Sequence, residues 1–127
     1  MKTRLTLILV LLIYIGAASH THAQQKKVIK TMMIAGQDGS HYWQGALKQI
    51  LENSGMFKVD FAFTPDFGGD IATFKPDFHQ YDLIVINYGG ATWTEPVRKN
   101  FEKYVADGGG VVVIHSSVVP MADWKEY

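Results

Sequence analysis

A run of four β-branched residues, Val111 to Ile114, constrains the fold of this chain more than any other feature. Three glycines precede the run and His115 follows it. Consecutive apolar residues without polar alternation are typical of a strand buried on both faces, as in a parallel sheet between two helix layers. Ligands of such sheets bind beyond the carboxyl ends of the strands. The run therefore predicts an α/β fold with His115 at the mouth of a site.

The rest of the chain alternates strands and helices in the same way. The patterns predict strands over residues 28–35, 57–64, 83–86 and 111–114, and helices over 42–54 and from a Thr94 cap to the glycines at 108–110. Alternation with short connections favours parallel strands and right-handed crossovers. We predict a three-layer α/β/α sandwich with strand order 2-1-3-4, in which the strand over 57–64 lies at an edge because its second face is mostly polar.

The N-terminal segment, residues 1–23, is predicted to be a secretory signal peptide. Lys2 and Arg4 precede an apolar run over 5–18, and the segment ends in the small residue Ala23. The run is shorter than the roughly 20 residues of a membrane span. We predict cleavage after Ala23, a secreted or periplasmic protein and no stable span after cleavage; an uncleaved anchor is the alternative.

Composition excludes several classes of function. The chain has no cysteine, which excludes a disulfide framework, a thiolate nucleophile and a zinc–thiolate cluster. Removal of residues 1–23 takes away two of the 12 basic residues and none of the 12 acidic ones, so the net charge becomes about −2 and a nucleic-acid partner is not expected. The loop over 36–40 lacks both phosphate-binding motifs, so no nucleotide is expected.

Three loops leave the carboxyl ends of the first, third and fourth strands, and the loops after the first and third should diverge and open a crevice. The candidate site residues in them are Gln37, Asp38, His41, Asn87, Trp93, His115, Asp123 and Trp124.

Each type of candidate residue has a role. His115 and His41 are candidate acid/base groups, because imidazole exchanges protons near neutral pH. Asp38 and Asn87 would orient a substrate, and Trp93 would offer a face on which a sugar ring can stack. The alternative for His115 is a histidine that satisfies a backbone carbonyl.

Two further interpretations concern metal and the first helix. His41 and His115 are weak candidates for a divalent metal, together with Asp38 or Asp123, because imidazole and carboxylate suit such ions. No local histidine spacing supports them. Trp43 is expected in the core, because it falls on the apolar stripe of the helix over 42–54.

The order and spacing of several short motifs resemble the ThuA-like (trehalose-utilisation) family. The motifs are Gly36 with His41 and Trp43, Gly69-Asp70, Lys75 to Phe78 running into Tyr81-Asp82, Asn87-Tyr88, the glycines at 108–110, and Val113 to His115 with Asp123-Trp124.

The resemblance implies a flavodoxin-like fold of the class I glutamine amidotransferase type without its nucleophilic cysteine, and His115 follows the strand at about that position. It also implies a role in disaccharide or keto-sugar metabolism. Family domains are about twice this length, so residues 24–127 would form the N-terminal portion of one. The resemblance assigns no role to Ser116 or Ser117.

We therefore expect an exported ThuA-like protein that acts on a small carbohydrate, a disaccharide or keto-sugar, as a hydrolase or isomerase. It would not be a cysteine-dependent amidotransferase, and the cofactor stays open. The rival hypothesis is a non-catalytic carbohydrate-binding or accessory module on the same fold. A third is an inactive fragment whose sheet exposes apolar surface.

Overall fold

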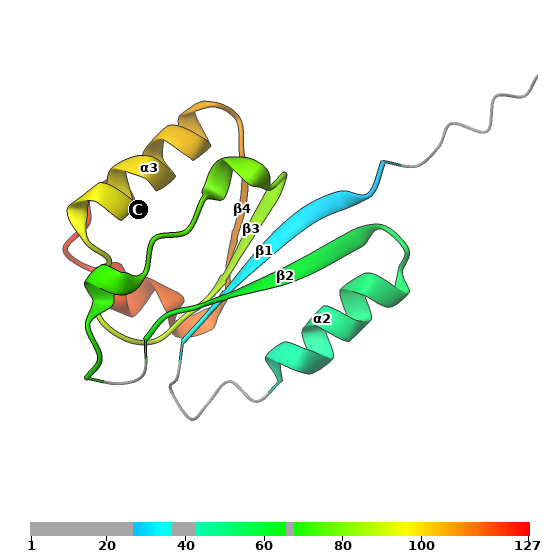
Figure 1. Cartoon of the computed structure of the whole chain (residues 1–127), viewed down its shortest axis with the longest axis horizontal. Helices are drawn as coiled ribbons and strands as arrows, with labels where there is room; N and C mark the ends of the chain where they lie inside the picture. The colour runs from blue at the N-terminus through cyan, green and yellow to red at the C-terminus, as the bar shows by residue number, and fades with distance from the viewer. Residues whose placement is uncertain (1–26, 37–42, 66–67) are drawn as a thin grey trace, which may run out of the picture.

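The computed structural model describes residues 27–36, 43–65 and 68–127, and it contains a single sheet of four parallel strands (Figure 1). The order in the sheet is β2-β1-β3-β4, as predicted from the sequence. The strands and helices are β1 (Ile29–Ala35), α2 (Gln44–Asn53), β2 (Phe57–Phe63), β3 (Leu83–Asn87), α3 (Glu95–Ala106) and β4 (Gly110–Val113). Three 3-10 helices complete the described part: η1 (Ile71–Thr73), η2 (Phe78–Gln80) and η3 (His115–Met121).

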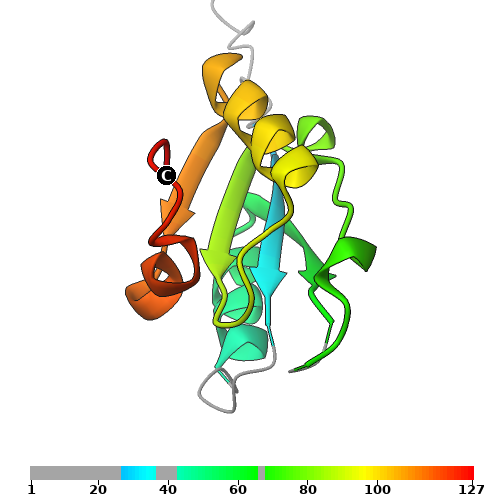
Figure 2. The same cartoon turned by 90° about the vertical axis from the view of Figure 1, so that its left-hand side faces the viewer.

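The two helices cover opposite faces of the sheet (Figures 1 and 2). Along β1, Met32 and Ile34 belong to the apolar cluster under α3, whereas Met33 between them belongs to the cluster under α2. This alternation follows from the two-residue period of a strand. The predicted three-layer α/β/α sandwich is therefore confirmed.

The layer on the α3 side is built from aromatic rings. Phe78 lies 5.3 Å from Phe101 in an edge-on contact, and Trp93 lies 5.7 Å from Phe101. Burying a ring of this size contributes about 1.5–3 kcal/mol. Because Phe78 comes from the irregular segment between β2 and β3, these contacts hold that segment against the sheet.

The helix α2 buries less of its apolar stripe than the sequence predicts. Leu47 and Leu51 pack against the cluster beneath it, but Trp43 is 40% exposed and Ile50 is 67% exposed. The expectation of a buried Trp43 is therefore wrong. Its position explains this, because Trp43 occupies the N-cap, before the first turn of the helix.

The strand β4 is less buried than the sequence predicts. The sequence predicts a strand buried on both faces, but Val112 and Val113 are both exposed. The reason is its place at the end of the strand order, where it pairs with β3 alone among the described strands. Its apolar composition correctly indicates a strand, but not the number of its neighbours. At the opposite edge, β2 confirms the predicted edge strand.

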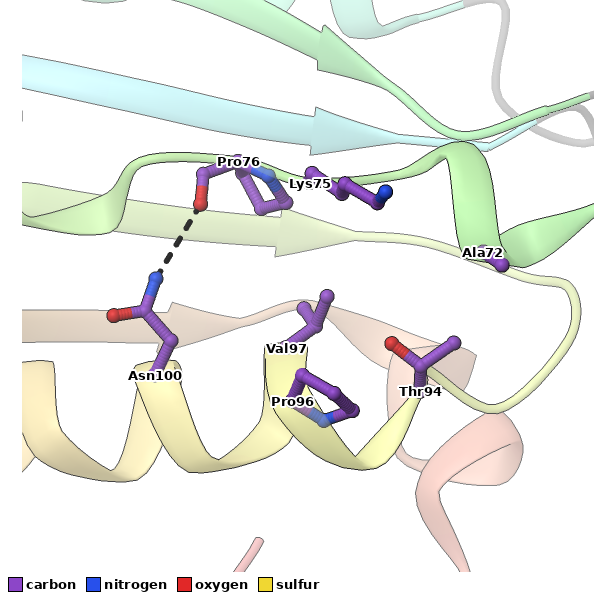
Figure 3. A pocket seen from close by; sticks show the side chains of 7 residues that line it. All are labelled: Ala72, Lys75, Pro76, Thr94, Pro96, Val97 and Asn100. Atoms are coloured by element: carbon purple, nitrogen blue, oxygen red, sulfur yellow. Dashed lines mark hydrogen bonds between the residues drawn. The ribbon is translucent and has the colours of Figure 1, made fainter.

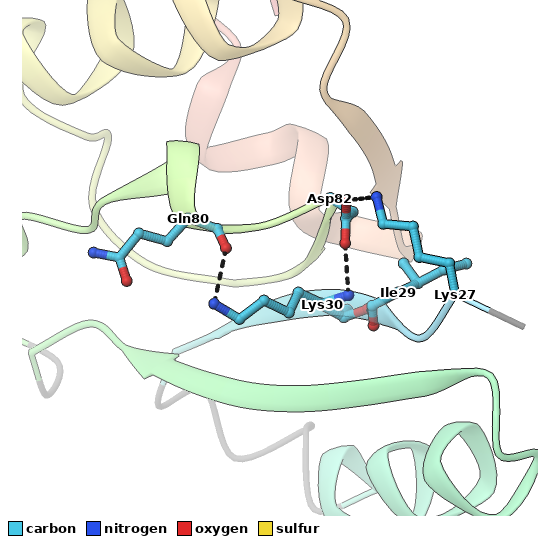
Figure 4. A network of polar contacts seen from close by, with 6 residues as sticks. Lys27, Ile29, Lys30, Gln80 and Asp82 are labelled. Carbon is cyan, nitrogen blue, oxygen red and sulfur yellow. Dashed lines mark hydrogen bonds and ion pairs between the residues drawn. The ribbon is translucent and has the colours of Figure 1, made fainter. Parts of the chain in front are cut away.

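A polar network joins the beginnings of β1 and β3 (Figure 4). The Asp82 carboxylate accepts hydrogen bonds from Lys27 Nζ at 2.6 Å and from the Lys30 backbone N–H at 2.9 Å, and Lys30 Nζ donates to the Gln80 carbonyl at 3.3 Å (Figure 4). The hydrogen bond from Lys27, followed by that from Lys30, lowers the pKa of Asp82.

Within the described ranges, no helix is long and apolar enough to cross a membrane.

Candidate functional site

The carboxyl ends of β1, β3 and β4 lie at the same end of the sheet, where the sequence predicts the site (Figure 2). His115, Asn87, Trp93, Asp123 and Trp124 all belong to the described part of the chain. The other three candidates, Gln37, Asp38 and His41, lie outside the described residues.

His115 has an unusual backbone conformation. With a φ of 51°, it is the sole non-glycine residue with a positive φ in the described part of the chain. The left-handed region costs an L-residue roughly 1–2 kcal/mol. Strand pairing continues to the residue before it, because the Ile114 N–H donates to the Ile86 carbonyl at 2.9 Å. The chain thus turns sharply at His115, and its side chain is exposed at the edge of the sheet.

A buried serine holds this turn in place. Ser117 Oγ donates to the Ile114 carbonyl at 2.6 Å and accepts a hydrogen bond from the Tyr88 N–H at 2.9 Å. The Ser117 side chain is fully buried. Since Tyr88 follows β3 and Ile114 follows β4, a single hydroxyl links the ends of two strands across the turn that carries His115. Strain that the surrounding structure supports in this way is common at functional sites.

The point between β1 and β3, where the connections diverge, is occupied by the Tyr88 ring. A Cβ atom on Gly36 would lie 2.6 Å from this ring, and one on Gly90 would lie 2.7 Å from the Tyr88 hydroxyl. The hydroxyl donates to the Ala91 carbonyl at 2.5 Å, and burial raises the pKa of Tyr88. Glycine is therefore needed at position 36 because an aromatic ring approaches the backbone there.

The two tryptophans predicted to line the site are in the core. Trp93 is 1% exposed, and its ring lies 5.6 Å from Phe74 and 6.2 Å from Trp124. Trp124 is buried as well, and its indole N–H donates to Glu102 at 2.7 Å. Other aromatic rings cover both, so Trp93 does not offer the stacking face predicted from the sequence, and Trp124 does not present its ring to a ligand in the structure described.

The prediction for Asn87 also needs correction. The sequence places Asn87 in a loop after the third strand, but β3 continues through it and pairs it with Ala35. The residue is fully buried, and its backbone carbonyl accepts a hydrogen bond from Gln44 Nε2 at 3.3 Å. Because its side chain is enclosed, Asn87 does not present an amide to a ligand.

The remaining candidates of the described part, His115 and Asp123, do not belong to a group of potential metal ligands. Asp123 is exposed in the turn that follows η3. In the ranges that the structure describes, no three histidine, cysteine, aspartate or glutamate residues come together as potential metal ligands. The predicted metal set includes His41 and Asp38, which lie outside these ranges, so the metal stays a prediction.

A cavity of about 600 Å³ lies between η1, with the segment that follows it, and the first turns of α3 (Figure 3). Its lining residues are Ala72, Lys75, Pro76, Thr94, Pro96, Val97 and Asn100. Asn100 Nδ2 donates to the Pro76 carbonyl at 3.4 Å and joins the two walls (Figure 3). Apart from Lys75, Thr94 and Asn100, the lining is apolar. No sequence pattern indicates this cavity, because its walls come from two separate segments of the chain.

Comparison with known proteins identifies the family. The family model of ThuA, trehalose utilisation, matches residues 11–127. No curated protein matches the chain. A crystal structure of a protein from Parabacteroides merdae ATCC 43184 described as ThuA-like is similar, with 46% sequence identity and a TM-score of 0.72. The similarity covers 79% of this chain and 37% of that one. The chain spans little more than a third of its solved relative; it belongs to the ThuA family and has a flavodoxin-like α/β fold.

Proposed function

We propose that this chain transforms a small carbohydrate, a disaccharide or a keto-sugar, with His115 as the acid/base group. The observation that supports this most is the left-handed backbone of His115 directly after β4. A strained turn holds an imidazole at the carboxyl edge of a parallel sheet, where ligands of such sheets bind. The family supports carbohydrate as the class of substrate.

An imidazole can serve either predicted reaction type. Hydrolysis of a disaccharide needs a proton for the leaving oxygen, and isomerisation of a keto-sugar needs a proton removed from the carbon beside the carbonyl. His115 is exposed, so a substrate can reach it, while Ser117 fixes its backbone through Tyr88 and Ile114. His41, Gln37 and Asp38 remain proposed members of the site.

The rival function, a non-catalytic carbohydrate-binding module, has less support. It relied on Trp93 as a stacking face, and this ring is buried among other aromatic side chains. The exposed imidazole on a strained backbone has no evident part in such a module. We therefore favour the catalytic function.

The test is turnover by the chain and by His115→Asn. Asparagine tolerates the left-handed region, so the variant should keep the backbone and lose only the titratable imidazole. Disaccharides are assayed for release of reducing sugar, and keto-sugars for exchange of the carbon-bound proton in D₂O. We expect His115→Asn to lose at least about 100-fold in turnover, the typical contribution of general acid/base catalysis.

The matched control is His79→Asn. His79 belongs to η2, and its Nδ1 lies 3.7 Å from Asp107 Oδ2. Its turnover should equal that of the unmodified chain. Equal turnover by His115→Asn, or no turnover of any of these sugars by the unmodified chain, would refute the function proposed for it.

Export is a separate part of the proposal. Residues 1–23 would direct secretion or transport to the periplasm, and the N-terminus of the exported protein would be Gln24. N-terminal sequencing of protein recovered outside the cytoplasm tests this, and an intact Met1 there would contradict cleavage.

A further inference from the structure

The cavity between η1 and α3 has the size and the lining of a small-molecule site. Its volume of about 600 Å³ is within the range of about 300–1,000 Å³ in which proteins hold small ligands. Such sites are mostly apolar, with a few polar groups that orient the ligand. Neither His115 nor any other site residue predicted from the sequence lines this cavity. A ligand here would therefore be additional to the sugar proposed for His115.

The wall of the cavity that carries Lys75 is fixed by its neighbours. Phe74, directly before Lys75, and Phe78, three residues after it, are both buried in the aromatic cluster under α3. The hydrogen bond from Asn100 Nδ2 to the Pro76 carbonyl, at 3.4 Å, ties the same wall to α3. Because these contacts hold the wall independently of a ligand, binding would order few groups of the protein.

Lys75 carries the charge of this cavity, since the other six lining residues are uncharged. Its ammonium makes no hydrogen bond or ion pair with any residue that the structure describes. The described acidic residues that flank the cavity along the chain have partners of their own, which are the Ala72 N–H for Asp70, Gln80 for Asp77 and Lys99 for Glu95. The positive charge of Lys75 is therefore available to an anion.

The polar and apolar parts of the lining are separated along the cavity. Figure 3 shows Lys75 Nζ and the Thr94 hydroxyl toward the η1 end, and the bond between Asn100 and Pro76 at the other end. The Thr94 side chain makes no capping hydrogen bond in α3, so its hydroxyl can also donate to a ligand. Val97 lies between the two ends. One end thus suits an anionic group, and the middle suits hydrocarbon.

We propose that this cavity binds a small organic monocarboxylate with an apolar body, an aryl or alkyl acid. The carboxylate would pair with Lys75 and accept the Thr94 hydroxyl, which offsets its loss of water. The body would cover Val97 and the prolines of the lining and remove their apolar surface from water. A single ammonium neutralises one carboxylate, but not a phosphate dianion. A disaccharide fits poorly, because most of its hydroxyl groups would have no partner among apolar walls.

The experiment titrates the chain with phenylacetate and hexanoate, and with the neutral amide of each acid. Titration calorimetry measures the affinity, and the backbone amide signals of Lys75 and Val97 in NMR spectra report where binding occurs. We expect both acids to bind and to shift these signals. The amides have nearly the same shape without the charge, so they should bind at least about tenfold more weakly. Acetate and inorganic phosphate, which lack an apolar body, should also bind at least about tenfold more weakly than the acids.

Variants of the lining separate the charge from the shape. Lys75→Met removes the charge, so the affinity for the acids should fall at least about tenfold while that for the amides stays the same. Lys75→Arg keeps the charge and should retain the affinity for the acids. Ala72→Phe fills the cavity and should weaken binding of acids and amides alike. Because Lys75 and Ala72 are exposed, these variants should fold, and urea unfolding checks this.

Lys58→Met is the matched control, because Lys58 is an exposed lysine of β2 that does not line the cavity. It should bind both acids as the unmodified chain does. The inference is overturned if neither acid binds, if the amides bind as tightly as the acids, or if neither Lys75→Met nor Ala72→Phe weakens binding of the acids. Acetate or phosphate that binds as tightly as the acids would also overturn it, because the apolar walls would then contribute nothing.

Discussion

Replacing Ser117 with alanine tests how firmly the turn around His115 is held. The substitution removes both hydrogen bonds of Ser117 Oγ. The Ile114 carbonyl keeps a partner, because it also accepts the Ser117 backbone N–H at 3.2 Å. The Tyr88 N–H loses its acceptor in a buried position, and an unsatisfied buried donor costs about 1–3 kcal/mol. We expect Ser117→Ala to lower the free energy of unfolding by about 2 kcal/mol.

Ser54 provides a matched control. Its hydroxyl makes the same two kinds of bond, donating to the Leu51 carbonyl at 2.6 Å and accepting the Met56 N–H at 3.1 Å, but in an exposed position. Water can replace the hydroxyl there, so Ser54→Ala should change the free energy of unfolding by less than about 0.5 kcal/mol.

Urea unfolding of the chain and both variants measures the difference, provided that the dependence of the free energy on urea is the same for all three. Equal, small losses for Ser117→Ala and Ser54→Ala would refute the reasoning, because burial of the Tyr88 N–H would then carry no cost.

Two further predictions concern packing and pH. A Cβ atom on Gly109 would overlap the Tyr104 ring, whereas one on Gly45 in α2 would meet nothing within 4 Å. Urea unfolding should therefore show Gly109→Ala destabilised by about 1–3 kcal/mol and Gly45→Ala stabilised by about 0.5–1 kcal/mol; a stabilised Gly109→Ala would contradict the overlap. The hydrogen bond from Lys27 lowers the pKa of Asp82 in the folded chain. The ionised Asp82 therefore contributes to the free energy of unfolding above the ordinary pKa of 3.8, and this contribution disappears as the pH falls below that value. The free energy of unfolding, measured between about pH 2 and 6, should depend less on pH in Asp82→Asn than in the unmodified chain. Identical pH profiles of the two proteins would contradict this role of Lys27.

The positions of the strands were predictable because each is a short apolar run with a clear end. The predicted strand over 83–86 and the observed Leu83–Asn87 differ by one residue, and the predicted strand over 57–64 differs by one residue from Phe57–Phe63. Strand order followed from the alternation of elements. Local patterns sufficed because these features depend on residues that are near one another in the chain.

The contents of the site were harder to predict, because they depend on contacts between distant segments. Trp93 lies in a glycine-rich loop, which suggests exposure, yet it packs against Phe74 and Phe101 from two other segments. Ser117 became a structural residue only because Tyr88, 29 residues earlier, brings its N–H to it. The sequence shows a serine two residues after the histidine that follows the fourth strand. It does not show that Tyr88 is the partner of this serine.

Among the described residues, His115 lies apart from the point between β1 and β3. Tyr88 fills the space between the ends of β1 and β3, where its ring touches Gly36 and Gly90 closely. His115 follows β4, the strand whose outer edge lacks a neighbour in the described ranges. In the order β2-β1-β3-β4, His115 is thus separated by β3 from the space that Tyr88 fills. A substrate of the proposed site would therefore contact the exposed imidazole beside the end of β4, rather than in the space between β1 and β3.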